Sequence, residues 1–337
     1  MVKIKNVAEA AGVSTATVSR VLADKPHVRP EVKKRVLEVV RKLNYQPNRV
    51  AQSLRSSTSK IIALVVADIE NPFFQRVSRA VDDYALEQGY NVMLCNTDED
   101  VDREKRCLEL LHVENIAGII LSPTRQSIED FDTIYSPNVP TVIIDRHIEN
   151  FAVDNVLIDN VSSTQQIVSH LIEHGHQRIA GIFGENSTTG LRRRDGFLKA
   201  LKAHDIKPAN DLLKFAPPTE DGGYQTAMKL LKTAKRPNAL FTSNSLLAVG
   251  ALLAIQEQEL EVPKDIAFAS FDDITWTKLV KPSITVVQQP TYEIGRTATE
   301  LLINKINDPS RSNREVVLNT KLVIRQSCGC SGSEQEQ

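Results

Sequence analysis

Charged, amide and aromatic side chains follow several short apolar runs of this 337-residue chain, at positions where buried strands would end. Carboxylates, a guanidinium and an amide beside aromatic rings suit a polyhydroxylated ligand, because hydroxyl groups need both hydrogen-bond donors and acceptors. We therefore expect a small-molecule site for a sugar or a sugar derivative. Its candidate residues are Asp68, Phe73, Phe74, Ser122, Asp145, Arg193, Asn244 and Asp272.

Each of these residues also has a purely structural interpretation. The aspartates could cap the helices that follow their strands, and Phe73 and Phe74 could be core residues. Arg193 stands within Arg192-Arg193-Arg194, so it could belong to an exposed basic helix face. Only the register of that helix separates the two interpretations, and three arginines leave room for an acidic or phosphate-bearing ligand.

The elements that must position these residues are parallel strands alternating with helices. Short β-branched runs alternate with amphipathic stretches from residue 61 to about residue 325, which is typical of βαβ units. The pattern restarts after Asp159-Asn160, and the segment is long for one sheet, so we expect two similar lobes with a ligand cleft between them. Expected strands are IIALVVA from Ile61, YNVMLCN from Tyr90, AGIILS from Ala117, TVIID from Thr141, RIAGIFG from Arg178, NALFTSN from Asn238 and IAFASFD from Ile266.

A helix-turn-helix pattern precedes this body. In NVAEAAGVSTATVSRVL, Asn6 is expected to cap a first helix with Glu9 completing a capping box, and Gly12 ends that helix. Ser14 is expected to cap a second helix from Thr15. Two helices joined by a short turn containing glycine place the second helix in a DNA major groove, although an ordinary helical hairpin has the same pattern.

The charge distribution favours DNA binding by this N-terminal segment. Residues 1–60 contain 13 Lys or Arg and 4 Asp or Glu, a local charge of +9, whereas the whole chain has a formal charge of −1. A basic segment gives salt-sensitive attraction to phosphates. A third helix is expected from Pro30, and a short helical segment over residues 47–55 is too short to be stable alone.

The motifs KNVAEAAGVSTATVSRVL and LNYQPNRVAQSLR closely resemble the head and hinge of the lactose-repressor (LacI/GalR) family, and the resemblance continues along nearly the whole chain. It implies an all-α helix-turn-helix head with a hinge helix, followed by a two-lobed α/β body of the periplasmic-binding-protein type with parallel sheets. It also implies a hinge that folds on operator DNA and a leucine that wedges into a minor-groove step. The DNA-contacting residues implied by the resemblance are Thr15, Ala16, Thr17, Arg20, His27, Asn48, Ala51, Leu54 and Arg55.

The same resemblance assigns roles in the body. Arg193, Asn244 and Asp272 match the family's polar ligand contacts, and Phe73 and Phe74 match its apolar wall. The sequence departs from the family at Pro217-Pro218, where many members place a ring that stacks on the effector, at Asn6, which is usually Asp, and at Arg29, which is usually a capping Ser.

The resemblance also sets the expected domain boundaries. The helix-turn-helix domain is expected at 1–46, the hinge and linker at 47–60, the effector-binding and dimerisation domain at 61–330, and a polar tail at 331–337. The N-lobe is expected at about 61–159 and 290–319, and the C-lobe at about 160–288 and 320–330. The chain is expected to cross between the lobes near 159–161, 288–290 and 319–321.

Other site chemistries have weaker support. His170, His174 and His176 include an i, i+4 pair, but their segment resembles the family's ordinary helix-to-strand junction, and no acidic or cysteine ligand accompanies them in the sequence. A structural role is therefore expected, with no metal and no cofactor. The cysteines Cys95, Cys107, Cys328 and Cys330 lack paired zinc-type spacing, and reduced thiols are expected.

The function indicated is a ligand-responsive transcriptional regulator, and not an enzyme, because the phosphate-cradling, nucleophile-elbow and metalloprotease motifs are absent from the sequence. We expect a cytoplasmic repressor that binds a palindromic operator as a homodimer, without membrane association. The tail SGSEQEQ lacks leucine heptads, which favours a dimer over a tetramer. A periplasmic-type sugar-binding protein, or a sugar-processing enzyme with an appended helix-turn-helix, is the alternative.

Overall fold

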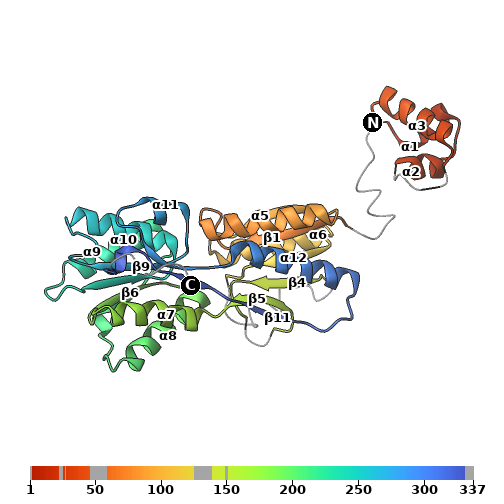
Figure 1. The fold of residues 1–337 in the computed structure, drawn as a ribbon. Coiled ribbons are helices and arrows are strands. Elements are labelled where there is room, and N and C mark those ends of the chain that lie inside the picture. The colour runs from red at the N-terminus through yellow and green to blue at the C-terminus, as the bar shows by residue number, and fades with distance from the viewer. Residues whose placement is uncertain are drawn as a thin grey trace. The chain divides into compact units, whose positions relative to one another are not determined.

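A computed structural model describes residues 2–22, 26, 28–45, 59–124, 139–148 and 151–330 of the chain. The chain divides into two compact units, Met1–Ser59 and Lys60–Gln337 (Figure 1). Each unit has a hydrophobic core of its own.

The N-terminal unit contains three helices around a small core. Its helices are α1 (Ile4–Ala11), α2 (Thr15–Leu22) and α3 (Pro30–Lys42). Val7, Val18 and Val36 are completely buried between them. Valines at these positions recur with helical spacing, so one face of each helix is apolar and the three faces close on each other.

The turn between α1 and α2 forms as the sequence predicts. Gly12 adopts a left-handed conformation with φ 62°, and its N–H donates to the carbonyls that end α1. The Ser14 hydroxyl accepts a hydrogen bond from the Thr17 backbone N–H at 3.1 Å, which caps α2. The glycine stop and the serine cap are both confirmed.

The expected start of α1 is wrong. The helix begins at Ile4 with Lys3 as its N-cap residue, so Asn6 lies within the first turn. The Asn6 side-chain oxygen accepts from the Lys3 backbone N–H at 2.9 Å, because an amide three residues after the cap reaches back as a capping-box residue does. Asn6 therefore takes the role that the sequence assigned to Glu9. At α3, Arg29 makes no side-chain cap, as its departure from the family pattern predicts.

The second unit contains two six-stranded sheets. The first has the order β11-β5-β4-β3-β1-β2 and is parallel throughout, and the second has the order β12-β10-β9-β8-β6-β7 with only β12 antiparallel. The first sheet comprises β1 (Ile61–Val66), β2 (Asn91–Asn96), β3 (Gly118–Leu121), β4 (Thr141–Ile144), β5 (Asp154–Ile158) and β11 (Glu315–Leu318). The second comprises β6 (Ile179–Gly184), β7 (Leu213–Ala216), β8 (Ala239–Thr242), β9 (Ala267–Phe271), β10 (Thr285–Gln288) and β12 (Lys321–Val323).

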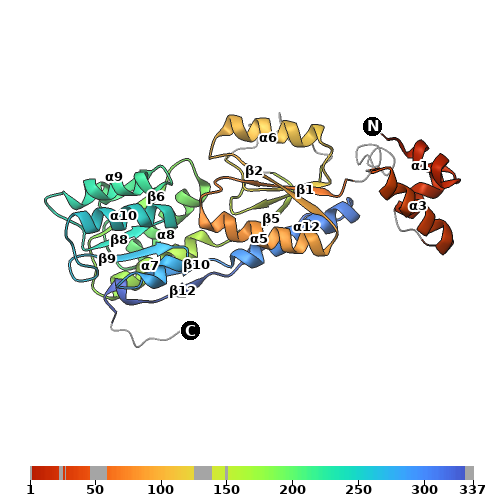
Figure 2. The same ribbon diagram turned by 90° about the horizontal axis from the view of Figure 1, so that it is seen from above.

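Helices cover both faces of each sheet, as parallel strands require (Figure 2). On the first sheet, α5 (Pro72–Glu87) and α12 (Thr291–Asn307) cover one face and α6 (Val101–Val113) covers the other. On the second, α7 (Asn160–Glu173) and α8 (Thr188–Ala203) lie opposite α9 (Glu220–Leu231) and α10 (Ser245–Glu257). The short elements are η2 (Asn210–Leu212), α11 (Thr275–Leu279) and η3 (Gln326–Cys328).

The seven strands expected from apolar runs are all present, which gives the two-lobed α/β fold. Strands β5, β7, β10, β11 and β12 are additional. Two of them have weak apolar signals because they are partly exposed: Phe215 of β7 is 40 % exposed and Val317 of β11 is 53 % exposed.

The chain passes between the two sheets three times. It leaves the first sheet after β5, returns between β10 and α12, and leaves again between β11 and β12. Each lobe is consequently built from discontinuous segments. Three segments of the chain therefore connect the lobes.

The packing of α9 against α10 generates a stability prediction. A Cβ atom on Gly250 would lie 1.9 Å from the Glu220 carbonyl oxygen and 2.5 Å from the Tyr224 backbone nitrogen, so the helices approach closely only because residue 250 has no side chain. Gly250→Ala should lower the free energy of unfolding by about 1–3 kcal/mol, despite alanine's better helix propensity.

Chemical denaturation of the full chain measures this loss. Leu253→Ala on the same helix is the control, because Leu253 is 50 % exposed, and its change should stay within about 0.5 kcal/mol. Equal stability of the Gly250→Ala and native proteins would show that the two helices do not need this close contact.

Candidate functional site

A pocket lies between the two lobes, at the carboxyl ends of the strands. Its residues come from the segments that follow β1, β2 and β4 in the N-lobe and β6, β7, β8, β9 and β10 in the C-lobe, including the first turns of α5 and α8. The cavity is about 40 Å³, room for only a few water molecules. It is lined by Asp68, Asn71, Phe73, Phe74, Glu99, Asp145, Arg146, Gly184, Ser187, Thr189, Gly190, Arg193, Pro218, Ser243, Asn244, Asp272 and Gln289.

Asp145 and Asp272 occupy equivalent places in the two lobes. Asp145 directly follows β4 and Asp272 directly follows β9, and each of these strands is the third in its sheet order. Both residues adopt left-handed backbone conformations, with φ 65° and 76°. Residues other than glycine rarely hold this conformation, and it concentrates at functional sites. The two lobes therefore turn corresponding carboxylates toward the same cavity.

Arg193 brings a buried cation into this cavity from α8. It is 4 % exposed, whereas Arg192 is exposed and Arg194 is half-buried, so the register of α8 selects Arg193 as the inward residue. Its Nε donates to Asn160 Oδ1 at 2.7 Å, one of its terminal nitrogens donates to the Ser243 carbonyl, and its guanidinium lies 3.8 Å from the Phe271 ring centre.

The charge on Arg193 is balanced from both lobes. Burial lowers the pKa of Arg193, while the charges of Asp272 and Asp145 oppose that shift. Burial likewise raises the pKa of both aspartates, and nearby arginines oppose the rise. Asp272 also accepts hydrogen bonds from Gln289 Nε2 at 2.7 Å and from the Ser245 backbone N–H at 3.3 Å.

The second guanidinium of the cleft belongs to the N-lobe. Arg146 donates to both Glu99 carboxylate oxygens and to the Pro123 carbonyl at 3.0 Å. Burial disfavours this cation, but its bond to Glu99 and the charges of Glu99 and Asp145 prevail and raise the pKa of Arg146. Both cleft arginines are therefore already engaged by groups of the protein itself.

The structure resolves several of the alternative interpretations. Asp68 Oδ1 accepts from the Glu70 backbone N–H at 2.8 Å, whereas Asn71 caps α5. Asp272 does not cap α11, the helix that follows it. In contrast, Asn244 does cap α10, since its Oδ1 accepts from the Leu247 backbone N–H at 2.8 Å. Its side-chain nitrogen remains available to face the cavity.

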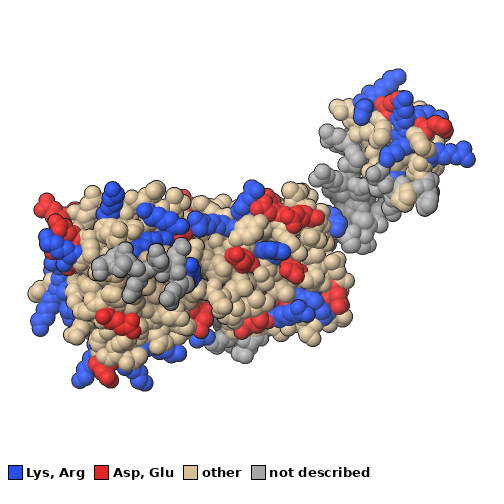
Figure 3. Space-filling view, in the orientation of Figure 1, with Lys and Arg blue, Asp and Glu red and all other residues tan. Residues whose placement is uncertain are grey.

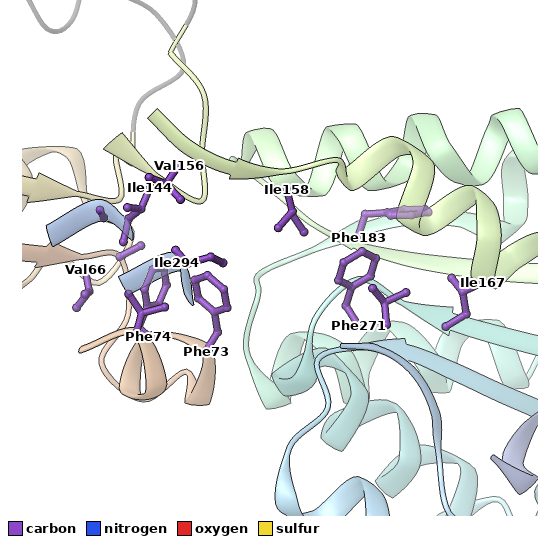
Figure 4. Packing of buried hydrophobic residues seen from close by; sticks show 14 of the residues in the cluster. Val66, Phe73, Phe74, Ile144, Val156, Ile158, Ile167, Phe183, Phe271 and Ile294 are labelled. Carbon is purple, nitrogen blue, oxygen red and sulfur yellow. The ribbon is translucent and has the colours of Figure 1, made fainter. Parts of the chain in front are cut away.

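The aromatic pair serves both the core and the cleft. Phe73 and Phe74 are 4 % and 3 % exposed and pack edge to face with ring centres 5.0 Å apart. They belong to the hydrophobic cluster that also contains Phe183 and Phe271 of the C-lobe, and both rings line the cavity (Figure 4). Phe73 and Phe74 can therefore be core residues and also form the apolar wall of the cavity.

Ser122 is placed outside the cavity lining. It follows β3 and is completely buried, and its hydroxyl has no hydrogen-bond partner among the described residues. Glu99 and Gln289 are among the lining residues that the sequence did not single out. Gln289 follows β10, which was not among the expected strands, and Glu99 lies within a polar TDED loop with no distinguishing pattern.

The expected DNA-contacting residues divide into two sets. Ala16 and Arg20 are exposed on α2, on the side away from the buried Val18, and Thr15 and Thr17 are half-buried. In the view of Figure 3 the N-terminal unit carries many Lys and Arg side chains. The remaining expected contacts, His27, Asn48, Ala51, Leu54 and Arg55, lie outside the described residues.

One expectation about histidine is wrong. Cysteine side chains do accompany His170, because the C-terminal turn after β12 folds back onto α7 and places Cys328 and Cys330 Sγ atoms 3.3 and 3.2 Å from His170 Nε2. This contact could not be predicted from the sequence, because 160 residues separate His170 and Cys330.

Comparisons with known proteins identify the family. Residues 3–48 match the model described as bacterial regulatory proteins, lacI family, and residues 168–328 match a periplasmic binding protein-like domain. The chain is 35 % identical over 327 residues to the ribose operon repressor of Halalkalibacterium halodurans, covering 97 % of each chain. The chain belongs to the LacI family.

Solved structures agree with this LacI-family assignment. The lac repressor dimer bound to operator and the anti-inducer ONPF gives a TM-score of 0.86 at 26 % identity, covering 97 % of this chain and 99 % of that one. The CelR–cellobiose complex gives a TM-score of 0.74 at 28 % identity, covering 97 % of this chain and 100 % of that one. The chain is thus a ligand-responsive, DNA-binding transcriptional regulator and not an enzyme. None of its described helices has the length and apolar character needed to cross a bilayer.

A hydrogen bond between the lobes generates the next prediction. Arg76 of α5 donates to the Asp273 backbone carbonyl at 3.1 Å, and Asp273 is itself fixed by Arg325 at 2.7 Å and by Lys278 at 3.2 Å. Arg76→Gln removes a charged donor that is present only when the lobes are close. We expect small-angle scattering of the ligand-free protein to show a larger radius of gyration, with little change in stability.

Arg79→Gln, one turn along α5, is the matched control because Arg79 pairs with Asp83 of its own helix. Its scattering curve should coincide with that of the native protein. A native-like curve for Arg76→Gln as well would contradict a role for this bond in lobe closure.

Proposed function

We propose that this LacI-family regulator represses transcription as a homodimer on a palindromic operator and that its effector is a neutral, polyhydroxylated small molecule of the sugar class. The observation that carries the effector assignment is the charge of the cleft. Four carboxylates line it, Asp68, Glu99, Asp145 and Asp272, against two guanidiniums, those of Arg146 and Arg193.

The charge balance disfavours an anionic effector. Arg146 is bound to both oxygens of Glu99, and Arg193 already donates to Asn160 and Ser243 and lies over the Phe271 ring, so only the remaining N–H groups of Arg193 can serve a ligand. An added anion would also face the excess carboxylates at short range in a poorly hydrated site. Hydroxyl groups, by contrast, can donate to Asp145 and Asp272 and accept from Asn244 and Arg193.

The names of similar proteins fit this assignment. One relative is named for the ribose operon, and one similar structure contains cellobiose. Pro218 lines the cleft where many family members place a ring, so Phe73 and Phe74 are the aromatic surface for a sugar's C–H face. The cavity of about 40 Å³ is too small for a monosaccharide, so effector binding must separate or rotate the lobes.

The coupling to DNA follows from the order of the chain. In the sequence, residues 47–58 join the helix-turn-helix unit to the N-lobe, which begins at Lys60 and β1, so the hinge is attached to one of the two lobes that form the cleft. In a dimer, two heads add their binding free energies on two half-sites. A change in lobe angle would alter the spacing of the two hinges and shift the population of DNA-competent dimers. Such a repressor acts in the cytoplasm.

A thermal-shift screen tests the effector class. Neutral pentoses, hexoses and disaccharides, including ribose and cellobiose, are compared with the corresponding sugar acids and sugar phosphates at equal concentration. At least one neutral sugar should raise the melting temperature, because a ligand that binds only the native state stabilises it. Stabilisation by sugar phosphates or acids alone would contradict the charge argument.

Replacing Asp272 tests the site itself. Asp272→Asn keeps the shape of the side chain but removes a charged acceptor that faces the cavity, so the affinity for the neutral effector should fall about 10-fold or more. Isothermal titration measures this, with Asp205→Asn as the exposed control. Operator affinity without effector should change little, and an unchanged effector titration would refute the assignment of Asp272.

Replacing Leu54 tests the hinge. Leu54→Ala removes the proposed apolar wedge, so operator affinity should fall about 10-fold or more while effector affinity stays the same. Fluorescence anisotropy with a selected palindromic duplex at fixed salt measures the first quantity. Leu279→Ala, 72 % exposed in α11, is the control. Equal operator affinity in the Leu54→Ala and native proteins would remove the hinge mechanism.

A further inference from the structure

Three side chains with soft donor atoms meet on the C-lobe, and they do not line the cleft. His170 Nε2 lies 3.3 Å from Cys328 Sγ and 3.2 Å from Cys330 Sγ, and the two sulfurs are 2.8 Å apart. His170 and Cys328 are buried, and Cys330 is half-buried. All three ligand atoms lie within 4.8 Å of one another.

The fold fixes this arrangement from two distant segments. His170 lies on α7, and Cys328 ends η3, which packs against β9 and β10. Thr285 Oγ1 donates to Cys328 Sγ at 3.2 Å and holds the sulfur in place. Gly329 adopts a left-handed conformation, φ 88°, which turns the chain so that the next cysteine reaches the same imidazole. The C-x-C spacing thus delivers two thiols to one histidine.

Neighbouring groups hold the histidine side of the cluster. The His174 ring lies 4.2 Å from the His170 ring, and its Nδ1 is 2.8 Å from the His170 carbonyl oxygen. His176 Nε2 is 3.0 Å from the Cys328 carbonyl oxygen. The ring contact limits rotation of the His170 imidazole, and the two hydrogen bonds hold the backbone of His170 and of Cys328 in place.

The dimensions of the cluster suit a tetrahedral thiophilic cation. Zn–S bonds of about 2.3 Å and Zn–N bonds of about 2.0 Å imply ligand atoms about 3.5–3.8 Å apart. The two nitrogen–sulfur distances are within about 0.3 Å of that range, and the two sulfurs need to separate by about 1 Å. Thiolate and imidazole donors favour Zn²⁺ or Cu⁺ over Mg²⁺ or Ca²⁺.

We propose that His170, Cys328 and Cys330 form a Zn²⁺ site that fastens the C-terminal turn to α7. Both thiols bind as thiolates, so two protons leave when the ion enters. A groove of about 510 Å³ runs along α7 and has His170, Ser169 and Glu173 among its lining residues, so His170 is the ligand through which we expect the ion to enter, with water as its fourth ligand. This site is independent of the effector cleft and of its proposed ligand.

The test uses the full-length dimer in a Cys95→Ser/Cys107→Ser background, because those two cysteines form a second thiol pair that could bind metal. The reduced protein is loaded with Zn²⁺, dialysed against a competing chelator and analysed for bound metal. We expect one Zn²⁺ per chain and a higher melting temperature than the metal-free form. Co²⁺ in place of Zn²⁺ should show sulfur-to-metal charge-transfer absorption.

Two further variants separate metal binding from folding. Cys330→Ser, at a half-buried position, should retain operator binding but lose at least tenfold in Zn²⁺ affinity, and His170→Gln should show the same loss. Failure of the reduced background protein to retain Zn²⁺ would overturn the proposal, as would native-like Zn²⁺ retention by Cys330→Ser. A Cys328–Cys330 disulfide in protein purified without reductant, together with no Zn²⁺ uptake after reduction, would identify the pair as a redox couple instead.

Discussion

The buried guanidinium of Arg193 is the interaction around which the cleft is organised. Arg193 is only 4 % exposed, and a buried positive charge needs negative charges nearby to offset its lost hydration. Asp272 of the same lobe and Asp145 of the other lobe supply these charges. The part of this compensation that Asp145 supplies therefore depends on the two lobes being close. A ligand that replaces some of these interactions changes the balance between closed and open arrangements, which is the requirement for a ligand-controlled switch.

The repeated architecture explains why such a switch can be built from so few residues. Two parallel sheets with the same strand order turn their carboxyl ends toward one cavity, and corresponding loops place an aspartate in a left-handed conformation on each side. Three passages of the chain link the two lobes. Arg76 adds a contact that exists only in the closed arrangement.

Much of this could be predicted from the sequence, because the strongest signals are local. Continuous apolar runs identified the central strands, and Gly12 and Ser14 identified the helix-turn-helix turn, since each acts on residues next to it in the chain. Four of the candidate cleft residues, Asp68, Asp145, Asn244 and Asp272, follow those strands within two residues. Strands β7 and β11 could not be found this way, because their partly exposed side chains interrupt the apolar pattern.

What the sequence could not give depends on contacts between distant segments. Which of the three consecutive arginines faces the cleft is decided by the packing of α8, which turns Arg193 inward. The pairing of Arg146 with Glu99 spans 47 residues of sequence, and the contact of His170 with Cys330 spans 160 residues. The acidic balance of the cleft likewise emerges only when loops from both lobes are assembled. It changes the expected effector from any sugar derivative, acids and phosphates included, to a neutral one.

The most direct measurement of the central claim is the effector's affinity for the native dimer, measured once with the dimer free and once with it saturated with operator. Since coupling is reciprocal, the two effector affinities should differ by the same factor as the operator affinities measured with and without effector, about 5-fold or more. Identical effector affinities in the two states would show that the cleft and the DNA-binding unit are not coupled, and would contradict the account.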